Sequence, residues 1–151
     1  MVEDADEQGE PLNVGLLLFI PYRAMEARVF QALAAAGFDD VTPAQARVMQ
    51  RIGPEGTRLT ELAEAAQVTK QTASSLVDQL ERAGYVRRTP DPSDARARLV
   101  RVAERGTAAR PIAENAVAEV EQEWQAHLGP RRWLQLRDAL TRLREITDPY
   151  A

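Results

Sequence analysis

The sequence predicts a mainly α-helical chain with one small β-hairpin, an α+β organisation. Residues 59–86 read as two short helices joined by a tight turn and followed by the start of a strand. Residues 85–102 then carry the alternation and the turn signal that are typical of a hairpin. Long stretches with helical apolar spacing, at about 12–37 and 104–147, flank this central part of the chain.

The first short helix is predicted from about Thr60 to Ala66. Threonine often caps the free amide groups at a helix start, and Glu61 favours the positive end of the helix dipole. Residues 67–68 form the predicted turn. A Thr-Pro pair at 42–43 has the same kind of start signal, so we expect another short helix there.

The second short helix is predicted from Thr69, its cap, to about Ala83, with Gly84 suited to a left-handed end. Its apolar side is formed by Ala73, Leu76, Val77 and Leu80. The N-terminal half of the opposite side carries no acidic residue. Its polar groups can donate and accept hydrogen bonds, as base edges in a DNA major groove require. The candidate DNA-binding residues on this helix are Thr69, Lys70, Gln71, Thr72, Ser74 and Ser75.

The two hairpin strands are predicted at Tyr85–Thr89 and Arg96–Val102, with a dense turn signal at 90–94. Residues 57–59 are predicted as a short strand that pairs with this hairpin. Residues 82–101 contain six arginines and two aspartates, a formal charge of +4 within a chain whose net charge is −4. Arginines concentrated beside the second helix can reach phosphates or an adjacent minor groove. The candidate DNA-binding residues on the hairpin are Arg87, Arg88, Arg96 and Arg98.

Each of these two features also has an ordinary structural explanation. Short helix pairs with a solvated polar face are common, and so are solvated charged hairpins. Because both features occur in adjacent stretches, we interpret them together as a nucleic-acid interface.

Four segments, taken together, resemble the MarR family of bacterial winged-helix regulators. They are VTPAQARVM at 41–49, LTELAEAAQVTKQTASSLVDQLERAGYVRR at 59–88, DPSDARARLVRV at 91–102 and ERG at 104–106. The resemblance implies a winged helix-turn-helix lobe at about 42–103 and long terminal helices that form a dimerisation region. It also implies a homodimer, a recognition helix in the major groove, a wing in the minor groove, and often a small-molecule pocket near the dimerisation region.

The chain departs from the family pattern at three positions. The family often has two basic residues after the wing aspartate, whereas Asp94 is followed here by Ala95, so the wing role is carried over to Arg96 alone. Ser75 stands where the recognition helix often has an arginine. Ala103 stands where a threonine usually caps the following helix, which predicts a weaker helix start.

The long terminal helices are predicted to be the dimer arms. The first, at about 13–36, is apolar over much of its circumference and therefore needs more than one neighbour. Pro21 predicts a kink or break in it, which either shapes a ligand cleft or only adjusts packing. A second long helix is expected at about 104–128, interrupted near Pro111, and a last one at about 131–146.

The remaining composition narrows the function classes. Residues 11–151 are long enough for one domain. The acidic residues 1–10 are predicted to be a disordered tail. This tail is either simply solvated or competes with DNA for the hairpin. The chain has no cysteine and one histidine, so we expect no metal site and no cofactor. No catalytic motif is recognisable, so an enzyme is not expected. The apolar run at 14–20 is too short to span a bilayer, and we expect a cytoplasmic protein.

Two functions fit these observations. The first is a homodimeric repressor that binds a palindromic operator in double-stranded DNA and is released by a small aromatic or anionic effector. The second is a winged helix used for protein–protein interaction, in which the arginine hairpin grips an acidic partner. The acid-free start of the recognition helix favours the first. Candidate ligand-binding residues, by position only, are Tyr22, Arg23, Arg47 and Trp124.

Overall fold

Six helices and one three-stranded antiparallel sheet make up residues 10–151, the part of the chain that the computed structural model describes. In chain order the elements are α1 (Val14–Ala35), α2 (Pro43–Met49), β1 (Thr57–Arg58), α3 (Leu59–Ala65), α4 (Lys70–Arg82), β2 (Val86–Asp91), β3 (Asp94–Val102), α5 (Glu104–Leu128) and α6 (Pro130–Thr147). The predicted acidic tail lies outside the described residues except for Glu10. No helix within residues 10–151 is long and apolar enough to cross a membrane.

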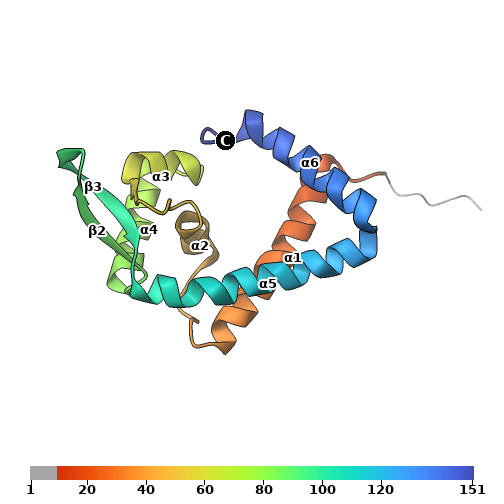
Figure 1. Cartoon of the computed structure of the whole chain (residues 1–151), viewed down its shortest axis with the longest axis horizontal. Coiled ribbons are helices and arrows are strands. Elements are labelled where there is room, and N and C mark those ends of the chain that lie inside the picture. The colour runs from red at the N-terminus through yellow and green to blue at the C-terminus, as the bar shows by residue number, and fades with distance from the viewer. Residues whose placement is uncertain (1–9) are drawn as a thin grey trace, which may run out of the picture.

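The elements separate into a small lobe and a set of long arms (Figure 1). The lobe holds α2, α3, α4 and the sheet, and the arms are α1, α5 and α6. Helices α1 and α5 pack on each other where the arms leave the lobe. Helix α6 then runs back from the far end of α5, and its C-terminal end reaches the lobe near α3 (Figure 1). The predicted combination of a winged helix-turn-helix with long terminal helices is confirmed.

The core of the lobe is built from the apolar side of α4 and its neighbours. Ala73, Val77 and Leu80 are fully buried, as the helical spacing predicted, and Leu76 packs against them at the edge. They meet side chains from the other lobe elements, namely Val48, Leu62, Tyr85, Val86 and Val100. Because residues from all lobe elements meet in one cluster, the exposed side of α4 is held rigidly on the outside.

Short-range signals set most of the helix ends. The Thr69 side chain accepts a hydrogen bond from the Thr72 amide at 3.1 Å, and Thr42 forms a reciprocal capping box with Gln45. Gly84 has a φ of 85°, the left-handed conformation expected after α4. Ala103 gives α5 no side-chain cap, as predicted.

The predicted start of α3 is wrong by one residue. The helix begins at Leu59 with Arg58 at its N-cap position, and no side chain caps it. The chain enters α3 directly from β1, so the extended conformation that an N-cap needs is already supplied by the last strand residue. Thr60 therefore lies inside the first turn and cannot act as the cap.

The hairpin is longer than predicted, because its strands extend to Asp91 and Asp94 and leave only 92–93 as the turn. The strand order is β1-β3-β2, so β2 is an edge strand and can contain Pro90 without losing an inner hydrogen bond. The predicted pairing of residues near 57–59 with the hairpin is confirmed, since Thr57 and Arg58 pair with β3.

Neither long helix is broken by its proline. Helix α1 continues through Pro21 and α5 through Pro111, so a break at Pro21 and an interruption near Pro111 are both wrong. The alternative expectation of a kink at Pro21 stays a prediction. A proline removes one main-chain hydrogen bond and crowds one turn, whereas the rest of each helix keeps its own bonds and packs on the other. Tertiary packing therefore overrides the local penalty.

Candidate nucleic-acid interface

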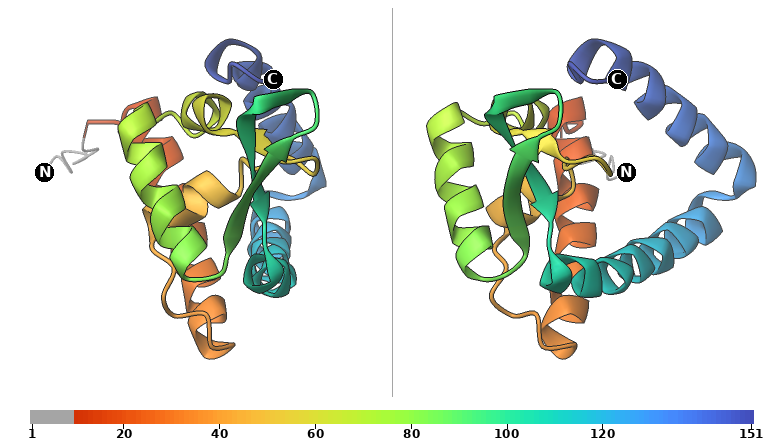
Figure 2. Two further views of the ribbon diagram at one scale, coloured as in Figure 1. Left: turned by 90° about the vertical axis from the view of Figure 1, so that its left-hand side faces the viewer. Right: turned by 60° about the vertical axis from the view of Figure 1, so that its left-hand side comes forward.

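The exposed start of α4 and the hairpin lie next to each other on one side of the lobe. Figure 2 shows both elements facing the viewer when the lobe end of the molecule is turned forward. The long arms extend from the opposite side of the lobe (Figure 1). A ligand that contacts α4 and the hairpin together would therefore approach from the end remote from the arms.

The first turns of α4 present polar groups to solvent. Lys70, Gln71, Thr72 and Ser75 are exposed, whereas Ser74 is half-buried. The Thr69 hydroxyl is occupied in the cap, where it also donates to the Thr72 hydroxyl at 2.9 Å. The structure thus brings the six candidate residues of the helix to one end, with Gln71 and Ser75 on the outermost side. One positive charge and no carboxylate lie in the first two turns.

Three of the four candidate arginines of the hairpin extend into solvent. The side chains of Arg87, Arg96 and Arg98 are exposed and form no hydrogen bond or ion pair with any residue that the structure describes. Alternate strand residues share a face, and Arg88 lies opposite Val100, so Arg96 and Arg98 occupy the sheet face of Arg88. That face contacts α4 through Arg88, so Arg96 and Arg98 lie on the α4 side of the hairpin.

Arg88 is placed differently from its neighbours. Only 19% of its side chain is exposed, and its guanidinium pairs with Asp78 and with Glu81, each at 2.8 Å. Its main-chain amide also donates to Glu81 at 3.1 Å. The structure therefore directs Arg88 onto the C-terminal half of α4 rather than into solvent.

A second arginine–carboxylate contact stiffens the hairpin, and no local pattern in the sequence predicts it. Arg58 of β1 reaches across β3 to Asp91 of β2, with 2.7 Å between Nη2 and Oδ2. Hydrogen bonds from the amide and hydroxyl of Ser93, together with Arg58, lower the pKa of Asp91 to about 2. Arg58 and Asp91 are 33 residues apart, so only the three-dimensional pairing reveals the contact.

The candidate ligand-binding residues fall into two groups, one that lines a cavity between the arms and one that does not. Tyr22 and Trp124 line a cavity of about 770 Å³ between α1, α5 and α6. Arg23 and Arg47 do not line it, and both pair with Glu26 instead, while Arg47 also donates to the Tyr22 hydroxyl at 3.3 Å. Apolar residues that the sequence reasoning missed provide most of the lining, and they are Leu17, Leu18, Phe19, Met25, Leu136 and Leu140.

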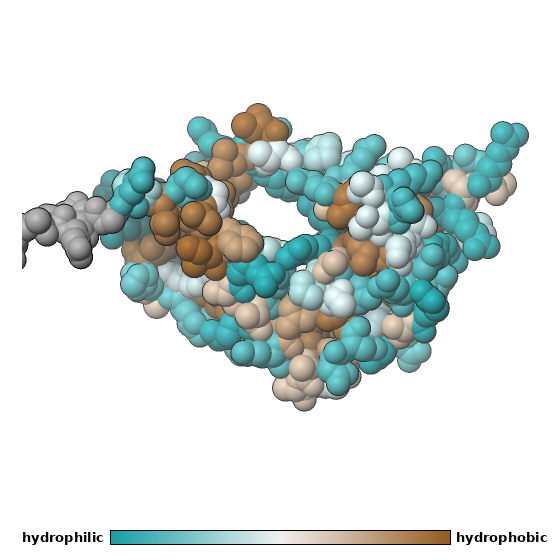
Figure 3. All heavy atoms as spheres, turned by 180° about the vertical axis from the view of Figure 1, so that it is seen from behind, coloured by the Kyte–Doolittle hydropathy of each residue, from teal (hydrophilic) through white to brown (hydrophobic). Residues whose placement is uncertain are grey.

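The same arms expose an extended apolar surface. Figure 3 shows hydrophobic side chains gathered at the end of the molecule where α1 begins, beside an opening between the arms and the lobe. Phe19 is 56% exposed and Leu134 is 65% exposed. The other large apolar side chains that are exposed on the arms include Val14, Leu16, Leu17, Leu18, Ile20, Leu140, Leu143 and Ile146.

A helix-turn-helix unit whose recognition helix begins without an acidic residue, flanked by an arginine-bearing hairpin, defines a winged-helix DNA-binding protein. A family model described as the MarR family matches residues 39–97, which include most of the lobe. The match identifies this part of the chain as a winged-helix lobe of the MarR type. No curated protein matches the sequence.

Solved structures extend the similarity beyond the lobe. CouR from Rhodococcus jostii, bound to p-coumaroyl-CoA, is 27% identical, with a TM-score of 0.70 and coverage of 91% of this chain and 93% of its own. A transcriptional regulator from Thermotoga maritima is 26% identical, with a TM-score of 0.57 and coverage of 87% and 92%. A MepR variant from S. aureus, bound to an oligodeoxyribonucleotide, shares the fold at 22% identity, with a TM-score of 0.57 and coverage of 89% and 98%.

Proposed function

We propose that this chain is a homodimeric repressor that binds a palindromic operator and is released from it by a small ligand. The observation that carries the proposal is the position of Arg96 and Arg98 on the α4 side of the hairpin, beside the acid-free start of α4. A DNA-binding regulator is the coarser class that the family establishes. The dimer, the operator symmetry and the ligand are the finer parts of the proposal.

The contacts to DNA follow from the charges and hydrogen-bonding groups of the interface. Gln71 and Ser75 on α4 can reach base edges in the major groove, because they combine donors and acceptors at the exposed tip. Lys70 at the tip of α4 supplies positive charge to phosphates beside that groove. Arg87 lies on the other face of the hairpin, opposite Arg101, and adds positive charge there. Arg96 and Arg98 can enter the neighbouring minor groove or contact its phosphates.

Arg88 has a different role in this proposal from the one the sequence suggested. Its guanidinium is paired with two carboxylates of α4, so it has little capacity left for a phosphate. We assign it to holding the hairpin against the recognition helix. The interface then consists of the tip of α4 together with Arg87, Arg96 and Arg98.

A second copy of the chain accounts for the exposed arms. Contiguous apolar surface on a monomer marks an interaction site, and here it continues along α1 and α6. A two-fold dimer would present two recognition helices to half-sites about one helical turn apart, so the operator would mirror the protein symmetry. Two linked contacts also bind far more tightly than one.

Release by a ligand is supported by the cavity beside the arms. Tyr22 and Trp124 line it, and CouR, which shares the fold, was solved with p-coumaroyl-CoA. A ligand bound between α1, α5 and α6 would change the relative position of the arms and therefore the separation of the two recognition helices. The ligand binds more tightly to the arrangement that no longer matches the half-sites. The loss of DNA affinity cannot exceed this difference in ligand affinity between the two arrangements.

The experiment that tests the proposal is the selection of bound sequences from random duplex DNA. We expect enrichment of an inverted repeat with half-sites about 10 base pairs apart. A shift assay on the selected sequence, repeated with a panel of small aromatic acids and antibiotics, then tests release. Binding that is equal for every sequence would contradict the proposal and favour a winged helix that grips an acidic protein partner.

The dimer is tested separately by the mass in solution. Leu17→Glu places a charge in the exposed apolar surface of α1, and we expect a shift from dimer to monomer with loss of operator binding. Gln122→Glu adds the same charge to an exposed position on α5 and serves as the matched control. A wild-type chain that is monomeric at micromolar concentration would remove the dimer from the proposal.

A further inference from the structure

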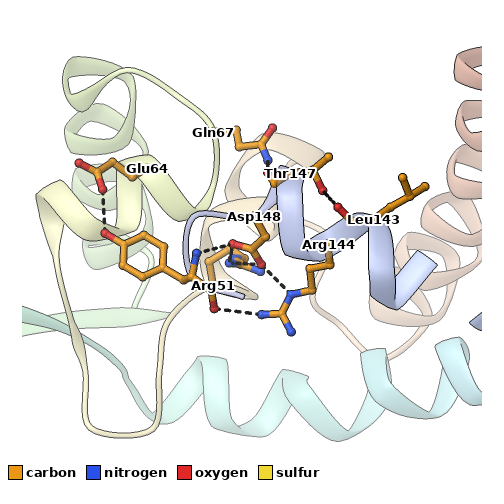
Figure 4. A network of polar contacts seen from close by, with 8 residues as sticks. Arg51, Glu64, Gln67, Leu143, Arg144, Thr147 and Asp148 are labelled. Carbon is orange, nitrogen blue, oxygen red and sulfur yellow. Dashed lines mark hydrogen bonds and ion pairs between the residues drawn. The ribbon is translucent and has the colours of Figure 1, made fainter. Parts of the chain in front are cut away.

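The C-terminal end of the chain makes a polar contact with the lobe that the proposed DNA interface does not use. After the last turn of α6, residues 148–150 fold against the loop after α2 and against α3 (Figure 4). The contact joins the end of α6 to the loop after α2, to α3 and to the turn after α3. We call residues 147–150 and their partners Arg51, Glu64 and Gln67 the C-terminal clasp.

Asp148 is the centre of the clasp. It accepts two hydrogen bonds from Arg51, at 2.8 and 2.9 Å, and one from Arg144 at 2.7 Å. The amide of Tyr150 also donates to it at 3.0 Å, and only 10% of its side chain is exposed. These donors lower the pKa of Asp148 to about 2, so the carboxylate is charged at neutral pH.

The other contacts reach the first helix of the helix-turn-helix unit and its turn. The Tyr150 hydroxyl donates to Glu64 of α3 at 2.8 Å, and Gln67 donates to the Thr147 carbonyl at 3.1 Å. Gln67 has a φ of 57°, the only left-handed non-glycine residue among the described residues. It occupies the turn that sets the direction of α4 relative to α3. The clasp therefore holds the element that orients the recognition helix.

The clasp also closes a ring of elements. The chain leaves the lobe through α5, turns at Gly129, and returns along α6 to the lobe at Asp148 and Tyr150 (Figure 1). Figure 3 shows the opening that this ring encloses. Without the clasp, the C-terminal end of α6 would lose the hydrogen bonds that join it to the lobe. Its contacts are polar and partly exposed, so they can open without exposing a hydrophobic core.

We propose that Asp148 and Tyr150 are positioning residues for DNA binding, which fix the orientation of the helix-turn-helix unit relative to α6. Since α6 belongs to the arms that pair the two copies, the clasp transmits the geometry of the dimer to the spacing of the recognition helices. This consequence rests on the proposed function. The closed clasp corresponds to the DNA-binding arrangement, and its opening frees the lobe to rotate.

The test measures the geometry directly and does not depend on DNA. The chain has no cysteine, so Arg82→Cys on α4 and Ala139→Cys on α6 give two defined positions for spin labels. Labelled chains are diluted with unlabelled ones, so that the distance within one protomer is measured. The clasp is opened by Asp148→Asn and Tyr150→Phe, separately and together. Asp138→Asn, at an exposed carboxylate of the same helix that pairs only with its neighbour Arg142 at 3.6 Å, is the matched control.

We expect one narrow distance distribution in the unaltered background and in the control, and a clearly broader one in the double variant. Arg51→Gln should broaden the distribution as much as Asp148→Asn, and combining the two should add nothing further, because both remove the same contact. A distribution whose width is unchanged in the double variant would overturn the proposal.

A second measurement separates positioning from general stability. In the double variant, the affinity for the selected operator should fall at least fivefold, while the thermal midpoint of the lobe stays within a few degrees of the control. A fall in affinity that is matched by general unfolding would assign the clasp a structural role only and would contradict the inference. If the unaltered chain selects no DNA sequence, the proposed function fails, and the distance distributions still decide whether the clasp orients the lobe.

Discussion

Arg88 in β2 and Asp78 in α4 form an ion pair at 2.8 Å, and Glu81 one turn further along α4 accepts a second hydrogen bond from the same guanidinium. The pair joins the base of the hairpin to the C-terminal half of the recognition helix. It also neutralises carboxylates that would otherwise repel DNA phosphates. Helix and hairpin are therefore presented to DNA as one unit.

This arrangement separates the effects of two arginine variants. Arg96→Ala should weaken operator binding by about 1–2 kcal/mol, roughly tenfold, and reduce the salt dependence by about one contact. Its thermal midpoint should be unchanged, since the side chain is exposed. Arg88→Ala should lower the midpoint by a few degrees because two carboxylates lose their partner. Thermal unfolding and the salt dependence of DNA affinity distinguish the two variants. If Arg88→Ala keeps its thermal midpoint and loses DNA affinity as Arg96→Ala does, Arg88 is a phosphate ligand.

Gln71 should determine which sequence is bound more than how tightly DNA is bound. Its amide is exposed at the tip of α4 and can donate and accept at a base edge at the same time. In Gln71→Ala we expect about 1–3 kcal/mol less discrimination at one operator position, with little change in affinity for random DNA. Competition with single-base operator variants measures this. Gln122→Ala on α5 is the control, and an equal loss on random DNA would show that Gln71 does not read bases.

Asp91 should make Tm fall more steeply as the pH is lowered from 4 to 2. Its folded pKa, about 2, lies below the ordinary value of 3.8, so the ionised carboxylate favours the folded state. This contribution is complete above about pH 4 and is lost as the pH falls towards 2. Asp91→Asn should lower Tm at neutral pH and flatten the decline of Tm between pH 4 and 2.

Asp148 also has a pKa of about 2, so part of that decline should persist in the Asp91 variant. Thermal unfolding followed from pH 7 to 2 checks both statements, with Asp138→Asn as the control. If Tm falls as steeply with acid in Asp91→Asn as in the unaltered chain, the hydrogen bonds from Ser93 and Arg58 to the Asp91 carboxylate do not contribute to stability.

The sequence was most informative where the deciding contacts are local. The cap at Thr69 depends on an amide three residues away, and the burial of Ala73, Val77 and Leu80 depends on helical spacing alone. Such patterns are fixed by neighbours in the chain, which is why they could be read without a structure. The charge of the hairpin was equally visible, because it depends only on composition.

Apart from the start of α3 and the length of the hairpin, the incorrect or incomplete predictions concern contacts between distant residues. The helices continue through Pro21 and Pro111 because tertiary packing outweighs a local penalty. Arg88 was assigned to DNA from its charge, while its distance from Asp78 could not be read from the sequence. The contact between Arg51 and Asp148 spans 97 residues and has no local pattern at all. Long-range polar partners therefore required the three-dimensional structure.

Gly106 should be intolerant of even the smallest side chain. A Cβ added there would lie 2.5 Å from the Tyr85 carbonyl oxygen and 2.8 Å from Cγ1 of Val102. Alanine normally favours a helix over glycine by about 1 kcal/mol, but a backbone carbonyl cannot move aside as a flexible side chain can. The same carbonyl accepts the Ala103 amide at 2.8 Å, which holds the junction between the hairpin and α5.

We therefore expect Gly106→Ala to destabilise the protein by about 1–3 kcal/mol, as overpacked cores do. At this chain length each kcal/mol lowers Tm by about 2–4 °C. Gly53→Ala is the matched control, because a Cβ there would lie no closer than 3.5 Å to its nearest neighbour. Thermal unfolding of both variants measures the difference. If Gly106→Ala is as stable as the control, α5 can shift away from Tyr85, and the junction between the hairpin and α5 is less rigid than its contacts indicate.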